Sequence, residues 1–126
     1  MRQALLIAAS LILLLPTAAQ VTAQGFLTRG AGFFAWMPGS KETMRGRISM
    51  SLLSRQGTIS GRTNTGIKCF GTTLINGALD RGQGTMRCED GRSGKFGYVL
   101  TSRLPPRGRG EGRLTTGQRV LLRITP

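Results

Sequence analysis

The sequence predicts an all-β domain, a small antiparallel barrel or sandwich of about seven or eight short strands, preceded by a cleaved signal peptide. Three observations lead to this fold class. Apolar and polar side chains alternate along most of the chain after residue 42, as they do in half-buried antiparallel strands. Glycine is frequent, with 19 among 126 residues, and it stands between the alternating runs. The first 23 residues have a different pattern, which is typical of an export signal.

The N-terminal segment 1–23 predicts export. A short positive start is followed by an almost wholly apolar run over 4–15, and small residues at 21–23 favour cleavage before Gln24. A membrane-spanning helix needs about 20 apolar residues, so the run is too short for an anchor. We therefore expect a bacterial protein that is exported to the periplasm or beyond, with no transmembrane segment in its mature chain.

The alternation places the strands in order along the mature chain. Ile48, Met50 and Leu52 share one face of the first run, and Phe96, Tyr98 and Leu100 share one face of a later run. The predicted strands cover residues 45–53, 57–62, 66–70, 72–76, 83–88, 94–102, 110–115 and 118–125. Tight turns are expected at 55–57, 63–66, 76–77, 89–92 and 115–118. A transmembrane barrel is excluded because the strands are short and their outer faces carry arginine.

The mature chain divides into an aromatic segment, 24–41, and a glycine- and arginine-rich β domain, 42–126. The aromatic segment holds a first strand plus a plug over one end of the core, in the interpretation we favour. The alternative is an exposed anchor for a partner protein, formed by Phe33, Phe34 and Trp36.

The two cysteines, Cys69 and Cys88, predict one disulfide, because an exported protein folds in an oxidising compartment. The closed loop would contribute about 3 kcal/mol to stability. Two cysteines and no histidine cannot complete a structural zinc site, so we expect no metal and no cofactor.

The stretch "MRCEDGRSGKF", residues 86–96, predicts a hairpin rather than an active site. A nucleotide-binding P-loop would need glycine at position 89 and Ser or Thr at position 96, where this chain has Glu89 and Phe96. Asp90-Gly91 is a strong turn signal, and we expect Arg92 to pair with Glu89 or Asp90. The protein is therefore expected not to be an enzyme. A small hydrolase that uses Asp80, Glu89, Asp90 or Glu111 is the last of the alternatives.

Three motifs carry a resemblance to known proteins. Cys69-Phe70-Gly71 is followed by "CEDGRSG" at 88–94 and by the glycine-rich stretch 110–114. In this order the chain resembles a group of small exported bacterial all-β proteins with C-x-G and C-x-D-G-R-x-G motifs and no established activity. The resemblance covers roughly residues 57–125. It implies an envelope location and the disulfide, and it implies no mechanism.

The charge of the chain points to an anionic partner. The 18 basic residues face only 5 acidic ones, and such an excess attracts polyanions. The C-terminal quarter holds the candidate anion-binding residues Arg103, Arg107, Arg109, Arg113, Arg119 and Arg123. Lipopolysaccharide phosphates, acidic polysaccharide or anionic lipid are the expected ligands, whereas export and the absence of a known motif argue against nucleic acid. The alternatives are arginines that only solubilise the strands, and a protein-interaction module or inhibitor that uses residues 33–37.

Overall fold

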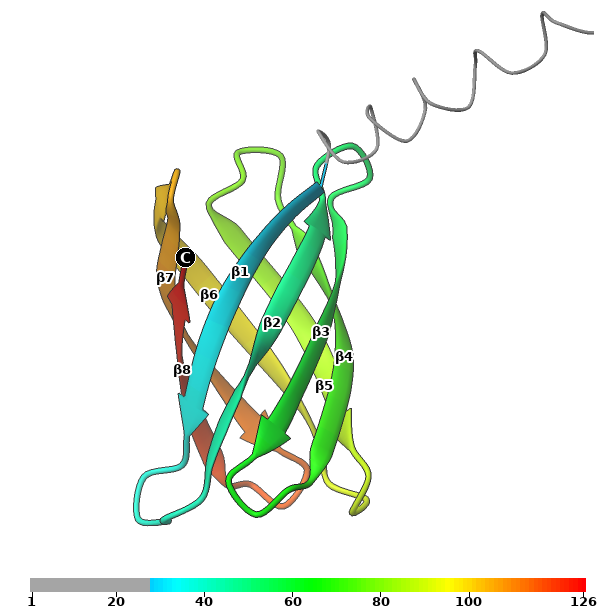
Figure 1. Ribbon diagram of the computed structural model, residues 1–126, viewed down its shortest axis with the longest axis vertical. Coiled ribbons are helices and arrows are strands. Elements are labelled where there is room, and N and C mark those ends of the chain that lie inside the picture. The colour runs from blue at the N-terminus through cyan, green and yellow to red at the C-terminus, as the bar shows by residue number, and fades with distance from the viewer. Residues whose placement is uncertain (1–27) are drawn as a thin grey trace, which may run out of the picture.

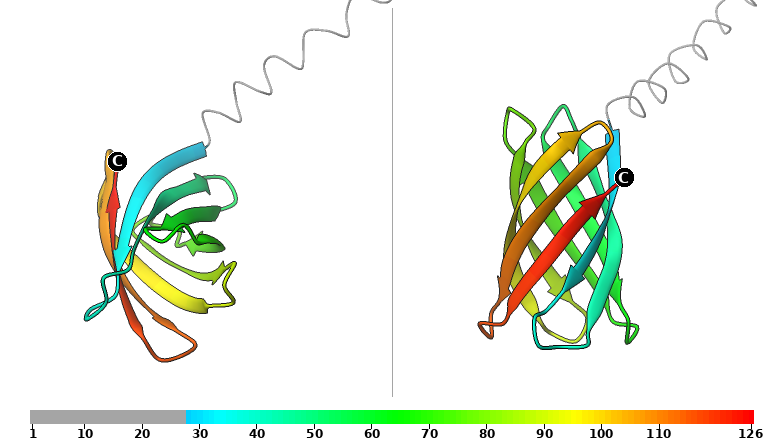
Figure 2. Two further views of the ribbon diagram at one scale, coloured as in Figure 1. Left: turned by 60° about the horizontal axis from the view of Figure 1, so that its bottom comes forward. Right: turned by 90° about the vertical axis from the view of Figure 1, so that its left-hand side faces the viewer.

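The computed structural model describes residues 28–126 as a closed antiparallel β-barrel, which confirms the predicted fold class. Each strand pairs with the next along the chain, and the last strand pairs with the first (Figures 1 and 2). The strands are β1 (Thr28–Trp36), β2 (Thr43–Ser51), β3 (Gln56–Thr63), β4 (Lys68–Ile75), β5 (Arg81–Cys88), β6 (Ser93–Arg103), β7 (Pro106–Leu114) and β8 (Arg119–Thr125).

The predicted signal peptide, residues 1–23, lies outside the described residues, as does Phe26. Between residues 28 and 126, no helix is long and apolar enough to cross a bilayer.

Side chains alternate between the barrel interior and the outer surface. Inward-facing residues form one core from five of the strands, composed of Ala31, Phe33, Ala35, Ile48, Ile59, Tyr98, Leu122 and Ile124. Closure by β1 and β8, in which Phe33 stands opposite Ile124, leaves no unpaired sheet edge. The fold therefore hides its edges by closure, which is one of the two solutions that the sequence predicted.

Inward-facing glycines make room for the large side chains of this narrow interior. A Cβ atom at Gly46 would lie 2.6 Å from the Phe33 ring, and one at Gly82 would lie 2.2 Å from the Tyr98 ring. Because real Cβ atoms do not approach other atoms so closely, an alanine at either position must displace its neighbours. Glycine in these strands is thus a packing requirement.

The strand connections gather at two ends of the barrel. The lower end in Figure 1 is formed by residues 37–42, 64–67, 89–92 and 115–118. Within it, Gly91 adopts a φ of 93°, a left-handed conformation that glycine takes without a Cβ penalty. The hairpin predicted for "CEDGRSG" is therefore present.

Three sequence-based expectations were wrong. The segments 66–70 and 72–76 are one strand, β4, because Gly71 faces inward within the strand and does not turn the chain. The turn expected at 55–57 ends at Arg55, which has a positive φ of 59°, and Gly57 already lies inside β3, as the predicted strand 57–62 had placed it. Residues 28–36 form the first strand that was expected in the aromatic segment, and this strand is part of the same closed barrel as the rest. The remaining described residues of that segment, 37–41, form the β1–β2 connection and not a separate plug.

Candidate functional site

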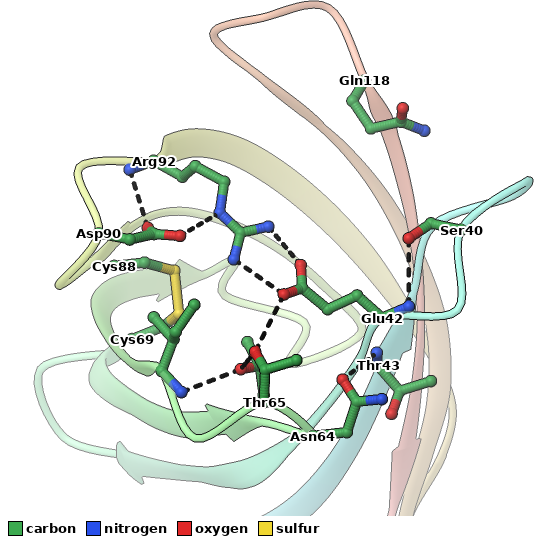
Figure 3. Close-up of polar contacts among 12 residues, drawn as sticks. Ser40, Glu42, Thr43, Asn64, Thr65, Cys69, Cys88, Asp90, Arg92 and Gln118 are labelled. Carbon is green, nitrogen blue, oxygen red and sulfur yellow. Dashed lines mark hydrogen bonds and ion pairs between the residues drawn. A yellow bond between two sulfur atoms is a disulfide. The ribbon is translucent and has the colours of Figure 1, made fainter.

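The two sulfurs are bonded to one another, as predicted. Cys69 and Cys88 stand directly opposite each other on β4 and β5, and the Cys69 side chain is fully buried. The bond lies near the lower end of the barrel (Figure 3). It is a structural staple and leaves neither cysteine as a free thiol.

A row of cations winds once around the outside of the barrel. The strand registers place one outward residue of each strand beside that of the next, starting on β5 and ending on β4 after a full circuit. We call this set the cationic row. Its members, in spatial order, are Arg81, Val99, Arg109, Arg123, Phe34, Arg45, Arg62 and Lys68.

The cationic row contains six basic side chains, two apolar ones and no acidic one, and all six cations are exposed. Arg109 faces Arg123 directly, and Arg62 stands between Arg45 and Lys68. Like charges directly opposite one another destabilise a sheet by about 0.2–1 kcal/mol per pair. Within residues 28–126, none of the six cations takes part in an ion pair. The row is therefore a concentrated positive surface that ends, beyond Lys68, at Glu89, the residue that follows β5.

Of the six predicted anion-binding arginines, the structure brings Arg109 and Arg123 into the cationic row and places the other four elsewhere. Arg113 and Arg119 face each other in a different row, where Arg119 pairs with Glu111 at 2.8 Å. Arg103 and Arg107 lie near the opposite, upper end, at the β6–β7 connection. Hydrogen bonding to Arg119 lowers the pKa of Glu111.

Sequence reasoning missed four members of the row, Arg45, Arg62, Lys68 and Arg81. They lie far from the C-terminal quarter in sequence, and barrel closure carries them into line with Arg109 and Arg123. The alternation of the strands already places each of them on the outer face. The register, which aligns them, cannot be read from alternation.

The predicted aromatic anchor is divided between the two faces of β1. Phe33 is buried in the core, which contradicts a partner-binding role for its side chain in the closed barrel. Phe34 and Trp36 face outward, half-buried, with their rings stacked 5.8 Å apart. The Arg45 guanidinium lies 4.9 Å from the centre of the Phe34 ring, so part of this aromatic surface is covered by a member of the cationic row.

An ion-paired bridge crosses the lower end of the barrel (Figure 3). Arg92, in the β5–β6 connection, donates hydrogen bonds to both carboxylate oxygens of Glu42, in the β1–β2 connection, one of them at 3.1 Å. These connections lie four strands apart in the eight-stranded ring and hence on opposite sides of it. Arg92 also pairs with Asp90 at 2.7 Å, as predicted, while Thr65 donates to Glu42.

Arg92 sets the ionisation of both acids that it contacts. Its side-chain hydrogen bonds lower the pKa of Glu42, and its backbone amide, which donates to Asp90, lowers the pKa of that carboxyl. The pKa of Arg92 is raised in return, mainly by Glu42. Both carboxylates therefore stay charged at neutral pH, which suits an ion pair and not a general acid.

An apolar cavity of about 100 Å³ lies inside the barrel behind this bridge. Its lining combines core residues such as Phe33 and Tyr98 with Glu42 and Arg92 of the lower connections. Glu42 is the single carboxylate among the described residues that line it, whereas Asp80 and Glu111 lie outside it. No group of three His, Cys, Asp or Glu side chains that could hold a metal ion occurs between residues 28 and 126.

Comparison with known proteins shows the fold and no family. No protein-family model matches the chain, and no curated protein matches it significantly. Among solved structures it is similar to a de novo designed fluorescence-activating β-barrel, with 14% identity, a TM-score of 0.59, and coverage of 82% of this chain and 95% of that one. It is also similar to a redesigned β-barrel bound to DFHBI, with 12% identity, a TM-score of 0.63, and coverage of 82% and 98%.

Proposed function

We propose that this chain is an exported, non-catalytic β-barrel that binds an anionic component of the bacterial envelope, lipid or polysaccharide, through the cationic row. The observation that carries the proposal is the row itself: six exposed cations that follow one circuit of the barrel with no acidic residue between them. An anion that bridges neighbouring strands would relieve the repulsion between cations that the register forces together.

The spacing of the row suits a ligand with repeated negative charges. Neighbouring strands lie about 4.8 Å apart, so the directly opposed cations, such as Arg109 and Arg123 or Arg45 and Arg62, leave their strands at about that interval. Five of the six cations are arginines, which bind phosphate and carboxylate through two parallel hydrogen bonds. A surface of clustered phosphates or acidic sugars offers several such groups at once. A single small anion would engage one or two arginines and leave the rest uncompensated.

The proposed location is the periplasm or the cell exterior. The bonded Cys69–Cys88 pair is consistent with an oxidising compartment, and the export signal expected at residues 1–23 supports the same placement. In that compartment, envelope phosphates and acidic glycans are the abundant anions that the row could contact.

Binding to lipid vesicles tests this proposal. The purified exported protein is sedimented with vesicles of phosphatidylcholine, with or without phosphatidylglycerol, and with lipopolysaccharide. Raising the salt from about 10 mM to about 0.15 M shortens the Debye length from about 30 Å to about 8 Å, so binding to the anionic surfaces should fall steeply. No binding to any anionic surface at low salt would overturn the proposal.

A matched pair of double variants locates the binding surface. Arg45→Gln with Arg62→Gln removes two neighbouring cations of the row, and we expect affinity to fall at least about tenfold, or 1.4 kcal/mol. Arg47→Gln with Arg87→Gln removes the same charge from outward positions that face no other cation. If both doubles lose affinity equally, net charge explains the binding and the row does not.

A further inference from the structure

The interior cavity offers a second site, chemically different from the outer surface. It occupies the lower part of the barrel, because its lining includes Trp36, Thr63, Cys88 and Leu114, which are the last residues of β1, β3, β5 and β7. The surface that it presents is almost entirely apolar. Among residues 28–126, no buried side-chain nitrogen or oxygen lacks a hydrogen-bond partner. No buried polar side-chain atom is thus left free to bind a polar group, and the apolar surface favours an uncharged apolar occupant.

The shape and lining of the cavity limit that occupant to a small molecule. The cavity has a volume of about 100 Å³, which is roughly two thirds of the volume of an apolar cavity known to hold one benzene molecule. Apolar cavities of about 150 Å³ in other proteins stay dry and bind benzene. Phe33, Phe96 and Tyr98 line the cavity, and the latter two rings stack 6.2 Å apart. Aromatic walls favour the face or edge of one further ring.

We propose that the barrel interior binds a free, uncharged apolar molecule no larger than a single aromatic ring, which passes beneath the Glu42–Arg92 bridge at the lower end. This inference is independent of the proposed anion binding, since no member of the cationic row lines the cavity. The bridge crosses the mouth and joins the connections that hold Glu42, Thr65 and Arg92. The fourth lower connection, 115–118, makes no hydrogen bond or ion pair with Glu42 or Arg92 (Figure 3). The Thr115 amide donates to the Ser93 carbonyl at 2.9 Å, so this connection is joined to β6 but not to the bridge. The gap between the bridge and the 115–118 connection is therefore the entrance that we assign.

Methionine methyl groups provide a direct test with an internal control. Met44 and Met86 are half-buried and line the cavity, as does Met37, whereas Met50 is buried and faces inward but does not line it. The exported protein is titrated with benzene and followed by NMR. The methyl resonances of Met44 and Met86 should move in a saturable manner, and that of Met50 should stay in place. Equal shifts at all three, or shifts that do not saturate, would overturn the proposal. A response to a short-chain phospholipid but not to benzene would overturn the assignment to a free ring.

Filling the cavity should abolish the response. Ala35 is a small, buried, inward-facing side chain of its wall, so Ala35→Val should weaken benzene binding several-fold or more. If that variant fails to fold, Val120→Leu serves the same purpose. Val120 also lines the cavity, from β8, and the change adds one methylene. Unchanged saturation in a folded, filled variant would show that benzene binds elsewhere.

The role of the bridge is tested through the rate at which benzene exchanges and not through the affinity for benzene. Arg92→Gln removes the charge that holds Glu42, and it should make exchange of benzene faster, seen as sharper Met44 and Met86 resonances at half saturation. The control Arg119→Gln removes an ion pair with Glu111 on the outer surface and should leave the exchange rate unchanged. Equal rates in both variants would exclude the bridge as the barrier to access.

Discussion

Replacing one inward-facing glycine by alanine should destabilise the barrel, and the same replacement on the outer face should not. A Cβ at Gly46 would lie 2.1 Å from the Ser60 carbonyl oxygen, 2.6 Å from the Phe33 ring and 2.7 Å from the Gly61 Cα. Two of these neighbours are backbone atoms and cannot move away cheaply. Overpacking of this kind costs about 1–3 kcal/mol, partly offset by about 0.4–1 kcal/mol from the less flexible unfolded chain. Because the shortest of these contacts is with a backbone atom, we take the upper end of this cost, about 3 kcal/mol, and expect a net loss of about 2 kcal/mol.

The matched control is Gly97→Ala, on the outer face of β6. The nearest atom to its added Cβ is the Gly82 carbonyl oxygen at 3.7 Å, an ordinary contact. Because nothing is overpacked, the only effect is that alanine makes the unfolded chain less flexible. We therefore expect the free energy of unfolding to rise by about 0.4–1 kcal/mol. Urea unfolding followed by the fluorescence of Trp36 measures both variants, and the midpoint should fall by about 1–2 M for Gly46→Ala. Equal midpoints for the two variants would refute the argument that inward-facing glycines are needed to leave room for the core side chains.

Three further outcomes follow from the core and from the bridge. Replacing both Cys69 and Cys88 by serine should lower the free energy of unfolding by about 3 kcal/mol, measured by the same urea titration, and reduction of the native protein should have the same effect. Burial raises the pKa of Tyr98, the single tyrosine of the chain. Its phenol should therefore ionise above the ordinary pKa of about 10. The free energy of unfolding should fall as the pH rises past that value, because only the unfolded chain ionises freely there. Arg92 lowers the pKa of Glu42, so stability should be lost as the pH falls below about 4.3, the ordinary pKa of a glutamate. Glu42→Gln should remove about 1 kcal/mol of that pH dependence.

The all-β class and the disulfide could be predicted from the sequence because both follow from local signals. Alternation of side chains gives the strands, and two cysteines in a chain that is predicted to be exported give the bond. The predicted strand boundaries were wrong where glycine serves two different purposes. A glycine that turns the chain, such as Gly91, and a glycine that makes room inside the barrel, such as Gly71, look alike in sequence.

The candidate site could be predicted only in part, because its geometry is set by contacts between distant strands. The positive charge and its exposure were evident, but a local cluster of arginines drew attention to the C-terminal quarter. The register across β8, β1, β2 and β3 decides which cations become neighbours, and it places Arg123 and Arg62 in one row. In the same way, the partner of Arg92 that closes the lower end is Glu42, 50 residues away, and no local pattern indicates it.

Comparison of two single variants measures the contribution of the cationic row most directly. Arg62 stands between two cations, whereas Arg47 on the neighbouring strand faces Gly32 and Ser60. Arg62→Gln should weaken binding to lipopolysaccharide at low salt several-fold more than Arg47→Gln does, and it should at the same time raise the free energy of unfolding by about 0.2–1 kcal/mol for each repulsive pair removed. Equal affinities for the two variants, with no gain in stability for Arg62→Gln, would contradict a row of cations held in place for an anionic ligand.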